Sequence, residues 1–230
     1  MAHHIARALC ALGVGACAAA VSAQTVYSHD FENGLAPGFN SGLIGQTPIA
    51  GRRFLGRFGN DSVTLSLTGL PSGSYRVDFD FYGIGTWDGN QAPGPDSFVV
   101  LHDLSTELLR TTFAIGSVDT RLGVQSYPGD GQSLLGGYWP GRSGAVENNT
   151  LGYYAGVYAR DAVWRLSADF DVEGDTARIT FRGEGLQALS DESWGIDNVH
   201  VERVIPAPGG LLAAIGACAI AGGRRRRRSR

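Results

Sequence analysis

Three acidic side chains near the two ends of the central part of the chain are of the type that binds calcium. Asp30 and Glu32 stand two residues apart near its start, and Asp197 lies near its end. Ca²⁺ takes about 6–8 oxygen ligands at roughly 2.3–2.6 Å. If the first and last strands of the domain lie side by side, Asp30, Glu32 and Asp197 meet and can hold Ca²⁺. The alternative is that these acids are solvated at strand ends or pair with arginine.

A second group lies in a segment rich in Gly and Pro. Asp88-Gly89-Asn90 is a turn signature, because Asp and Asn tolerate tight backbone geometry and Gly takes positive φ. Asp88, Asn90 and Asp96 can ligate a cation or hydrogen-bond a sugar beside Trp87. The alternative is a turn that binds no ligand.

A third acidic group, Glu184 with Asp191 and Glu192, raises the question of catalysis. A glycosidase needs two carboxylates at a fixed separation across the sugar bond. Residues 173–178 resemble the Glu-x-Asp-x-x-Glu signature of jelly-roll glucanases, but Arg178 occupies the position of the final acid. We therefore predict no catalytic residues, and a glycoside hydrolase or lyase is the alternative.

The composition excludes several kinds of chemistry. Cys10, Cys17 and Cys218, the only cysteines, lie in the terminal segments, and the chain has no Lys. Disulfides, zinc–thiolate sites, cysteine nucleophiles and Schiff bases are therefore excluded from the central part. That part carries 12 Arg against 22 acidic residues, whereas nucleic-acid binding needs a basic surface. No nucleic-acid partner is predicted.

The elements that position these residues are short strands. Residues 24–204 consist of runs with period two, separated by Gly, Pro, Asn and Asp. Residues 63–67 alternate, the odd positions of 75–81 are all apolar, and 176–182 alternate again. This pattern predicts an all-β domain over 24–204, an antiparallel two-sheet β-sandwich of the jelly-roll type.

One long segment, 115–161, breaks this rhythm. It is rich in Gly and aromatic residues, and long connections without structure are uncommon in compact domains unless they are functional or disordered. One interpretation is a long loop with a short hairpin packed over a sheet edge. The other is a ligand platform on which aromatic faces stack against sugar rings. The aromatic residues are Tyr127, Tyr138, Trp139, Tyr153, Tyr154 and Tyr158.

Residues 1–23 are typical of a signal peptide. Arg7 makes the start weakly basic, Ala8–Ala20 is apolar, and the small residues up to Ala23 fit a cleavage site after Ala23. Processing as a lipoprotein at Cys17 is the alternative. Either route predicts export.

The segment 205–230 has three parts in a fixed order: a proline motif, a small apolar run and a block of arginines. They are the motif at 205–208 with Pro206, Ala207 and Pro208, the apolar segment 209–223 and the arginine cluster 224–230. The order and terminal position resemble PEP-CTERM sorting signals, in which Glu usually stands where this chain has Ala207. The resemblance implies a Gram-negative bacterium, an exosortase-type processing enzyme, and a final location at the cell surface or outside the cell.

The same segment is long enough to cross a membrane. Residues 204–223 are about 20 in number, just sufficient to span at about 1.5 Å per residue. The arginines that follow stay on the cytoplasmic side. We therefore predict a transmembrane sorting helix and an inner-membrane intermediate, with the tail afterwards cleaved or kept as an anchor.

The central part also resembles known groups. It is similar to uncharacterised secreted β-sandwich proteins that carry such tails, a group that implies no established activity. The two ends, Asp30–Leu35 and Ile196–Val199, resemble those of MAM and concanavalin-like jelly rolls. Those families often bind carbohydrate or mediate adhesion, sometimes with calcium. The residues similar to the secreted group are Tyr75–Asn90, Pro95–Val100, Gln125–Pro128, Asn149–Gly152 and Asp191–Val201.

These observations favour an exported, noncatalytic protein of the cell surface or extracellular matrix. Its predicted partner is an extracellular polysaccharide or another surface component, and its predicted cofactor, if any, is Ca²⁺. The expected ligand-binding residues are Trp87, Asp88, Asn90, Asp96, Tyr138 and Trp139. A purely structural matrix protein without a small ligand is a further alternative.

Overall fold

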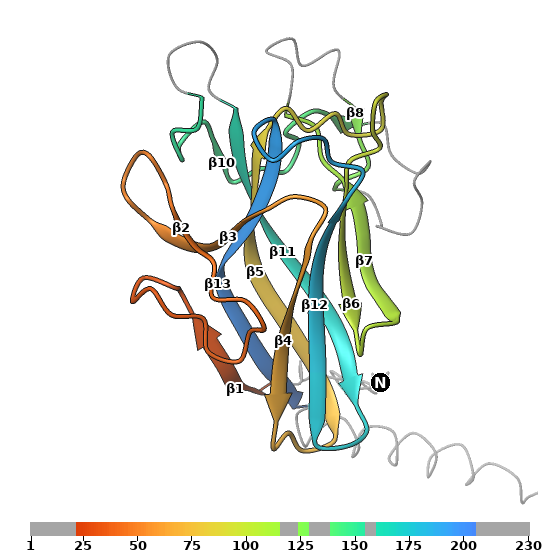
Figure 1. Ribbon diagram of the computed structural model, residues 1–230. Helices are drawn as coiled ribbons and strands as arrows, with labels where there is room; N and C mark the ends of the chain where they lie inside the picture. Colours follow the sequence, from red (N-terminus) through yellow and green to blue (C-terminus); the bar gives the residue numbers. More distant parts are fainter. Residues whose placement is uncertain (1–21, 116–123, 129–138, 155–159, 206–230) are drawn as a thin grey trace, which may run out of the picture. The chain divides into compact units, whose positions relative to one another are not determined.

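The computed structural model describes residues 22–115, 124–128, 139–154 and 160–205 (Figure 1). Within these ranges the chain forms strands and no helix, which confirms the predicted all-β class. The strands are β1 (Ser22–His29), β2 (Ile44–Gln46), β3 (Arg53–Phe58), β4 (Ser62–Thr68), β5 (Gly73–Gly85), β6 (Ser97–His102), β7 (Thr106–Thr112), β8 (Val124–Gln125), β9 (Trp139–Pro140), β10 (Glu147–Asn148), β11 (Asp161–Val172), β12 (Thr176–Glu184) and β13 (Glu192–Ile205).

The larger sheet has seven strands, in the order β10-β11-β5-β13-β3-β2, with β1 also paired to β13. Its pairs of defined register are antiparallel. In the longest pair, Asp161 of β11 lies opposite Ile84 of β5, and Val172 lies opposite Gly73. The first and last strands, β1 and β13, are neighbours, as the sequence interpretation required.

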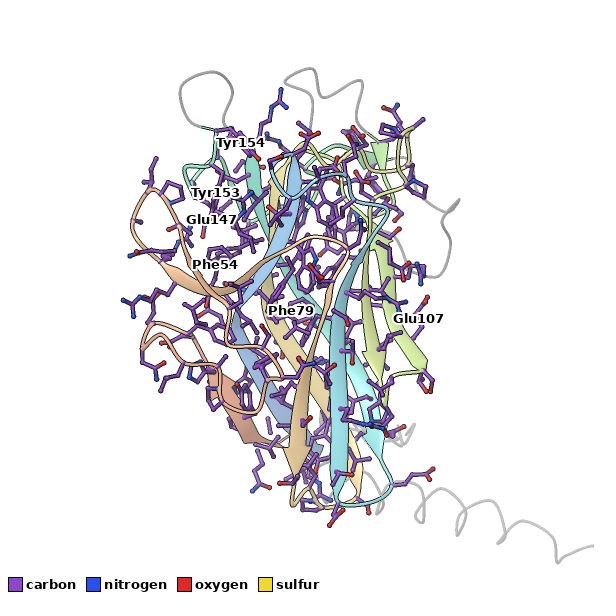
Figure 2. All side chains as sticks on the ribbon, in the orientation of Figure 1. Phe54, Phe79, Glu107, Glu147, Tyr153 and Tyr154 are labelled. Atoms are coloured by element: carbon purple, nitrogen blue, oxygen red, sulfur yellow. The ribbon has the colours of Figure 1, made fainter. Side chains whose placement is uncertain are left out.

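The smaller sheet has four strands, in the order β4-β12-β6-β7. Aromatic residues of β5 bridge the two sheets. The Phe79 ring centroid lies 4.9 Å from that of Phe181 in β12, and the Phe81 centroid lies 4.3 Å from that of Phe98 in β6. Figure 2 shows Phe79 in the space between the sheets. The two layers thus bury one apolar core between them.

The outer face of the larger sheet is covered in part by a second, smaller apolar cluster. Tyr82 and Ile84 of β5 point to the face opposite Phe79 and Phe81, yet both are fully buried. Side chains from β3 and from the segment after β10 cover them, so the end of β5 lacks the alternation of a half-exposed strand. The cluster consists of Phe54, Tyr82, Ile84, Leu151, Tyr153 and Val163.

The long segment 115–161 contributes short strands where it is described. β8 and β9 form a two-stranded sheet, and β10 adds to the larger sheet by pairing with β11. An isolated parallel bridge joins Val124 of β8 to Gly89, in the connection after β5. The described part therefore agrees with a short hairpin packed at a sheet edge.

Parts of the predicted targeting signals lie outside the described residues. These are 1–21 of the signal peptide, the motif Pro206, Ala207 and Pro208, and the rest of the tail. Ala23 lies in β1. Among the described residues there is no helix of the length and apolarity needed to cross a membrane.

Candidate functional site

Three carboxylates meet where β5 ends and β13 begins. Asp88, Asp96 and Glu192 each offer an oxygen, and these atoms all lie within 4.8 Å of one another. Glu192 is the first residue of β13 and pairs with Gly85, the last residue of β5. The connection from β5 to β6 contains Asp88 and Asp96 and places both of them beside Glu192. Antiparallel pairing therefore joins residues that are about a hundred positions apart in the sequence.

The backbone of this connection is held tightly around the cluster. The N–H of Asp88 donates to Oδ2 of Asp96, and the N–H of Asp96 donates to the Gly89 carbonyl at 3.0 Å. Gly89 has φ of 68°, and a Cβ there would lie 2.2 Å from the Val124 carbonyl oxygen. Only glycine fits this position. The acidic segment is thus fixed against β8.

Gln187 links two of the carboxylates. Its side-chain Nε2 donates to Oδ2 of Asp88 at 2.9 Å and to Oε1 of Glu192 at 3.1 Å. Its backbone N–H donates to Oε2 of Glu192 at 2.7 Å. Gln187 is exposed, whereas Asp96 and Glu192 are fully buried and Asp88 is half-buried. The cluster therefore opens to solvent on the side of Gln187 and Asp88.

In the described part of the chain the cluster has no positively charged partner, and Asp96 is short of hydrogen-bond donors. Among the described residues, no Arg or His forms an ion pair with any of its three acids. Oδ1 of Asp96 is buried and accepts no hydrogen bond. Burial, together with the charges of Glu192 and Asp88, raises the pKa of Asp96 to about 7, although the hydrogen bond from the Asp88 N–H lowers it. Burial also raises the pKa of Glu192 and of Asp88. The site is thus suited to bind something positive.

Of the second sequence group, the structure brings Asp88 and Asp96 together. Glu192, not Asn90, is the third member of the cluster. Oδ1 of Asn90 accepts a hydrogen bond from the Thr112 hydroxyl. Glu192 takes the place next to Asp88 and Asp96, although the sequence placed it among possible catalytic acids. No local spacing signals this partnership, because the pairing of β13 with β5 creates it.

Trp87 was expected to bind a ligand beside Asp88, Asn90 and Asp96, but the structure places it in the core. Its side chain is fully buried, and its Nε1 donates to the Ser193 carbonyl at 3.0 Å. Its ring packs edge-on against Phe81, with centroids 5.4 Å apart. The indole therefore belongs to the core, because the turn directs it inward between the sheets. Trp139, in contrast, is 45% exposed, and Tyr138 lies outside the described residues.

Asp30, Glu32 and Asp197 lie in separate hydrogen-bonded arrangements. Asp30 is exposed and accepts from the Glu32 N–H at 3.2 Å, and Glu32 accepts from the Arg53 N–H at 3.0 Å. Asp197 is buried, and its Oδ2 accepts from the Tyr82 hydroxyl at 2.7 Å. Asp30 and Glu32 follow β1, which pairs with the strand β13 that carries Asp197, but the hydrogen bonds of the three acids go to different partners. Within the described residues the three form no group of metal-binding geometry.

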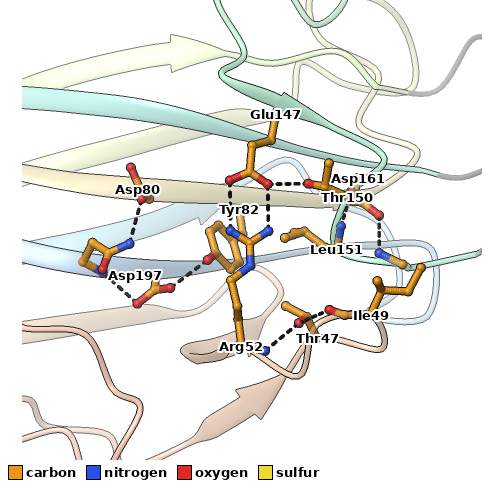
Figure 3. A network of polar contacts seen from close by, with 12 residues as sticks. Thr47, Ile49, Arg52, Asp80, Tyr82, Glu147, Thr150, Leu151, Asp161 and Asp197 are labelled. Atoms are coloured by element: carbon orange, nitrogen blue, oxygen red, sulfur yellow. Dashed lines mark hydrogen bonds and ion pairs between the residues drawn. The ribbon is translucent and has the colours of Figure 1, made fainter.

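Asp197 belongs to a polar network on the outer face of the larger sheet (Figure 3). In this network Arg52 donates to both carboxylate oxygens of Glu147, at 2.9 and 2.8 Å. The Arg52 guanidinium also lies over the Tyr82 ring, 5.6 Å from its centroid. Asp161 accepts from three backbone N–H groups at 3.0–3.1 Å. These contacts fasten the loop after β2 and the segment after β10 to the sheet.

Glu184 and Asp191, the other acids considered for catalysis, are also engaged. Glu184 forms ion pairs with Arg110, at 2.6 Å, and with Arg182. Asp191 accepts from the Thr86 hydroxyl at 2.5 Å. Glu192 is fully buried. Glu184 and Asp191 are therefore held by other side chains, and Glu192 lies in the cluster with Asp88 and Asp96.

No family model matches the chain, and no curated protein matches it. Solved structures match weakly. Latent PorU from Porphyromonas gingivalis is 11% identical over 84% of this chain, with a TM-score of 0.40, and this chain spans only 14% of PorU. A family 35 carbohydrate binding module from an environmental isolate is 14% identical over 79% of this chain and 98% of its own, with a TM-score of 0.39. A family GH115 4-O-methyl-alpha-glucuronidase is 12% identical over 77% of this chain and 17% of its own, with a TM-score of 0.38. At these values the similarities carry no argument about ligand or activity.

Proposed function

We propose that the chain is an exported, noncatalytic protein of the cell surface or extracellular matrix whose β-sandwich, of jelly-roll type, binds carbohydrate. The observation that carries this proposal is the exposed indole of Trp139. An indole offers a broad, rigid apolar face with few rotatable bonds, which suits stacking on a flat ligand such as a sugar ring.

The backbone around Trp139 is held in place by strand pairing and hydrogen bonds. Trp139 pairs with Gln125 of β8, which is fully buried. The Gln125 side chain accepts from the Arg142 N–H at 2.9 Å and donates to the Ser143 carbonyl at 3.0 Å. A preorganised aromatic side chain loses less conformational entropy on binding than one on a mobile loop. Val124 in turn bridges to Gly89, so the indole and the acidic segment share one framework.

The burial and pairing of the acidic residues favour binding over catalysis. A glycosidase needs two carboxylates that flank a bound sugar. Asp96 and Glu192 are fully buried, and Glu184 is held by two arginines. The burial of Asp96 and Glu192 and the two ion pairs of Glu184 leave these carboxylates poorly placed to flank a sugar.

Carbohydrate binding is tested by a glycan array and by gel retardation in polysaccharides, each with and without calcium. Trp139→Ala is expected to weaken binding about ten-fold or more, the scale of a buried aromatic anchor. Leu104→Ala is the control, since Leu104 is 52% exposed and lies in the turn between β6 and β7. A wild-type protein that binds no glycan contradicts the proposal and favours a structural matrix protein.

The route to the surface is proposed from the terminal segments. The signal peptide directs export and is cleaved after Ala23, the tail holds the protein transiently in the inner membrane, and an exosortase-type enzyme processes it near Pro206, Ala207 and Pro208. Mass spectrometry of the mature protein tests this route. A C-terminus at 206–209 supports sorting, whereas an intact Arg230 indicates a simple membrane anchor.

A further inference from the structure

Asp96 lacks the compensation that other buried acids of the described chain have. Asp80 accepts from Arg165 and Asn198, and Asp161 accepts from three backbone N–H groups. Asp96 accepts from one backbone N–H and leaves its Oδ1 without a donor. A buried polar atom without a partner is costly, and a buried charge is more costly still. Something absent from the polypeptide must therefore compensate Asp96.

Two kinds of compensation are chemically possible: a shared proton or a bound cation. A proton shared between Asp96 and Glu192 neutralises one carboxylate and leaves the charges of the other and of Asp88. A divalent cation compensates two charges at once and accepts all three oxygens as ligands. The convergence of three acids, with no arginine between them, favours the cation.

The spacing of the oxygens fits a single ion. Two oxygens bound to the same Ca²⁺ at roughly 2.3–2.6 Å lie at most about 5.2 Å apart. The three ligand atoms of Asp88, Asp96 and Glu192 all lie within 4.8 Å of one another. From these distances, the buried unpartnered oxygen and the donor set, we infer that Asp88, Asp96 and Glu192 bind Ca²⁺.

The donor types select the class of metal. The cluster contains only carboxylates, with neither His nor Cys, which zinc sites and other transition-metal sites normally use. Hard oxygen ligands suit Ca²⁺ and Mg²⁺, and Ca²⁺ tolerates the less regular geometry. The exposed Gln187 adds to this set. A half-turn of its amide replaces Nε2 by Oε1 between Asp88 and Glu192, which supplies a fourth protein oxygen. Waters complete the coordination from the solvent side.

The ion joins the connection after β5 to the start of β13. This connection also holds β8 through Gly89 and Val124, so the ion stabilises the end of the sandwich that carries Trp139. Calcium binding is measured independently of glycan binding. Failure of either proposal therefore leaves the other standing.

The test uses the full chain, freed of metal with a chelator, and follows its melting temperature and calorimetric heat during titration with CaCl₂. The titration covers on the order of 10 µM to 10 mM, which includes the range of extracellular calcium sites. We expect one ion per chain and a rise in Tm of roughly 5–10 °C at about 100 times the dissociation constant. No heat and no shift overturn the inference, and a response to Zn²⁺ or Mg²⁺ without Ca²⁺ overturns the metal assignment.

Asp96→Asn tests whether Asp96 is a metal ligand or only a structural hydrogen-bonding residue. The amide keeps an acceptor for the Asp88 N–H and adds a donor for Glu192, so the metal-free variant is expected to melt above the metal-free wild type. The same variant loses at least ten-fold in calcium affinity. A variant that keeps the calcium shift contradicts the inference. Asp88→Asn, at the half-buried position, is the second variant should Asp96→Asn not fold. Asp191→Asn, an adjacent acid outside the cluster, is the control that keeps the shift.

Discussion

Asp197 gives the fold a defined dependence on pH. Its carboxylate is 3% exposed, with Oδ2 accepting from the Tyr82 hydroxyl and Oδ1 from the Asn198 N–H, both at 2.7 Å. Burial raises its pKa from 3.8 to about 6. This value of about 6 already includes the two hydrogen bonds, which lower the pKa, and the charges of Asp80 and Glu32, which raise it. The folded protein therefore holds a proton on Asp197 more tightly than the unfolded chain does.

The sign of the effect follows from this difference in proton affinity. Because the pKa is higher in the folded state, the stabilising contribution is fully present below pH 3.8 and is lost as pH rises to about 6. The interval of about 2 pH units corresponds to about 3 kcal/mol in the free energy of unfolding. Asp197→Asn removes this titration. An amide between Tyr82 and Asn198 changes the free energy of unfolding by an amount that does not depend on pH. This change shifts the whole plot of stability against pH without changing its slope.

Urea unfolding followed by tryptophan fluorescence, at intervals from pH 3.5 to pH 8 in buffers of one ionic strength, measures this effect. Relative to wild type, Asp197→Asn is expected to gain about 2–3 kcal/mol between the two ends of the series. All other titrating groups are common to both proteins and cancel. Tyr82→Phe removes a hydrogen bond that lowers the pKa of Asp197, so the pKa of Asp197 in the folded variant is expected to be higher than in wild type. The decline of the variant's stability with rising pH is therefore expected to continue to a higher pH. Parallel stability curves for wild type and Asp197→Asn would refute the reasoning.

Two further predictions concern residues at the same end of the sandwich. Trp87→Ala removes a fully buried side chain and its hydrogen bond to Ser193, so urea unfolding is expected to show a loss of about 3–5 kcal/mol with unchanged glycan binding by the folded protein. A binding defect at normal stability would show that Trp87 contacts ligand. Gly85→Ala places a Cβ 1.7 Å from the Asp191 carbonyl oxygen at φ of 97°, so a loss of about 2 kcal/mol or more is expected. Gly174→Ala, where nothing lies within 4 Å, is the control, and equal melting temperatures for the two variants would contradict this reading.

The strand pattern of the sequence was a good guide to the fold. Residues 63–67 and 176–182 alternate in sequence, and both lie in strands, β4 and β12, that pair with each other. This succeeded because alternation reflects one buried and one exposed face, a local property of each strand. The end of β5 departed from it. Tyr82 lies on the face opposite Phe81, as strand alternation requires, but other side chains cover that face as well.

The candidate site was only partly predictable. Asp88 and Asp96 were found because a turn brings them together within one connection. Glu192 was not, because its place beside them depends on the pairing of β13 with β5. Trp87 was misread for the same reason. A tryptophan in a turn-like segment is open to solvent or buried according to what packs above it, and here Phe81 and Ser193 are in contact with it.

The sequence by itself determined the all-β class and the acidic character of the central part. Both follow from local periodicity or from composition, which do not depend on how distant segments meet. The adjacency of the first and last strands was a hypothesis from the jelly-roll type, and the pairing of β1 with β13 in the tertiary structure confirms it. The tertiary structure decided which acids converge, which indole is exposed, and that Asp30 and Glu32 stay apart from Asp197. These depend on register between strands far apart in the chain, and a shift of one residue would turn each side chain to the other face.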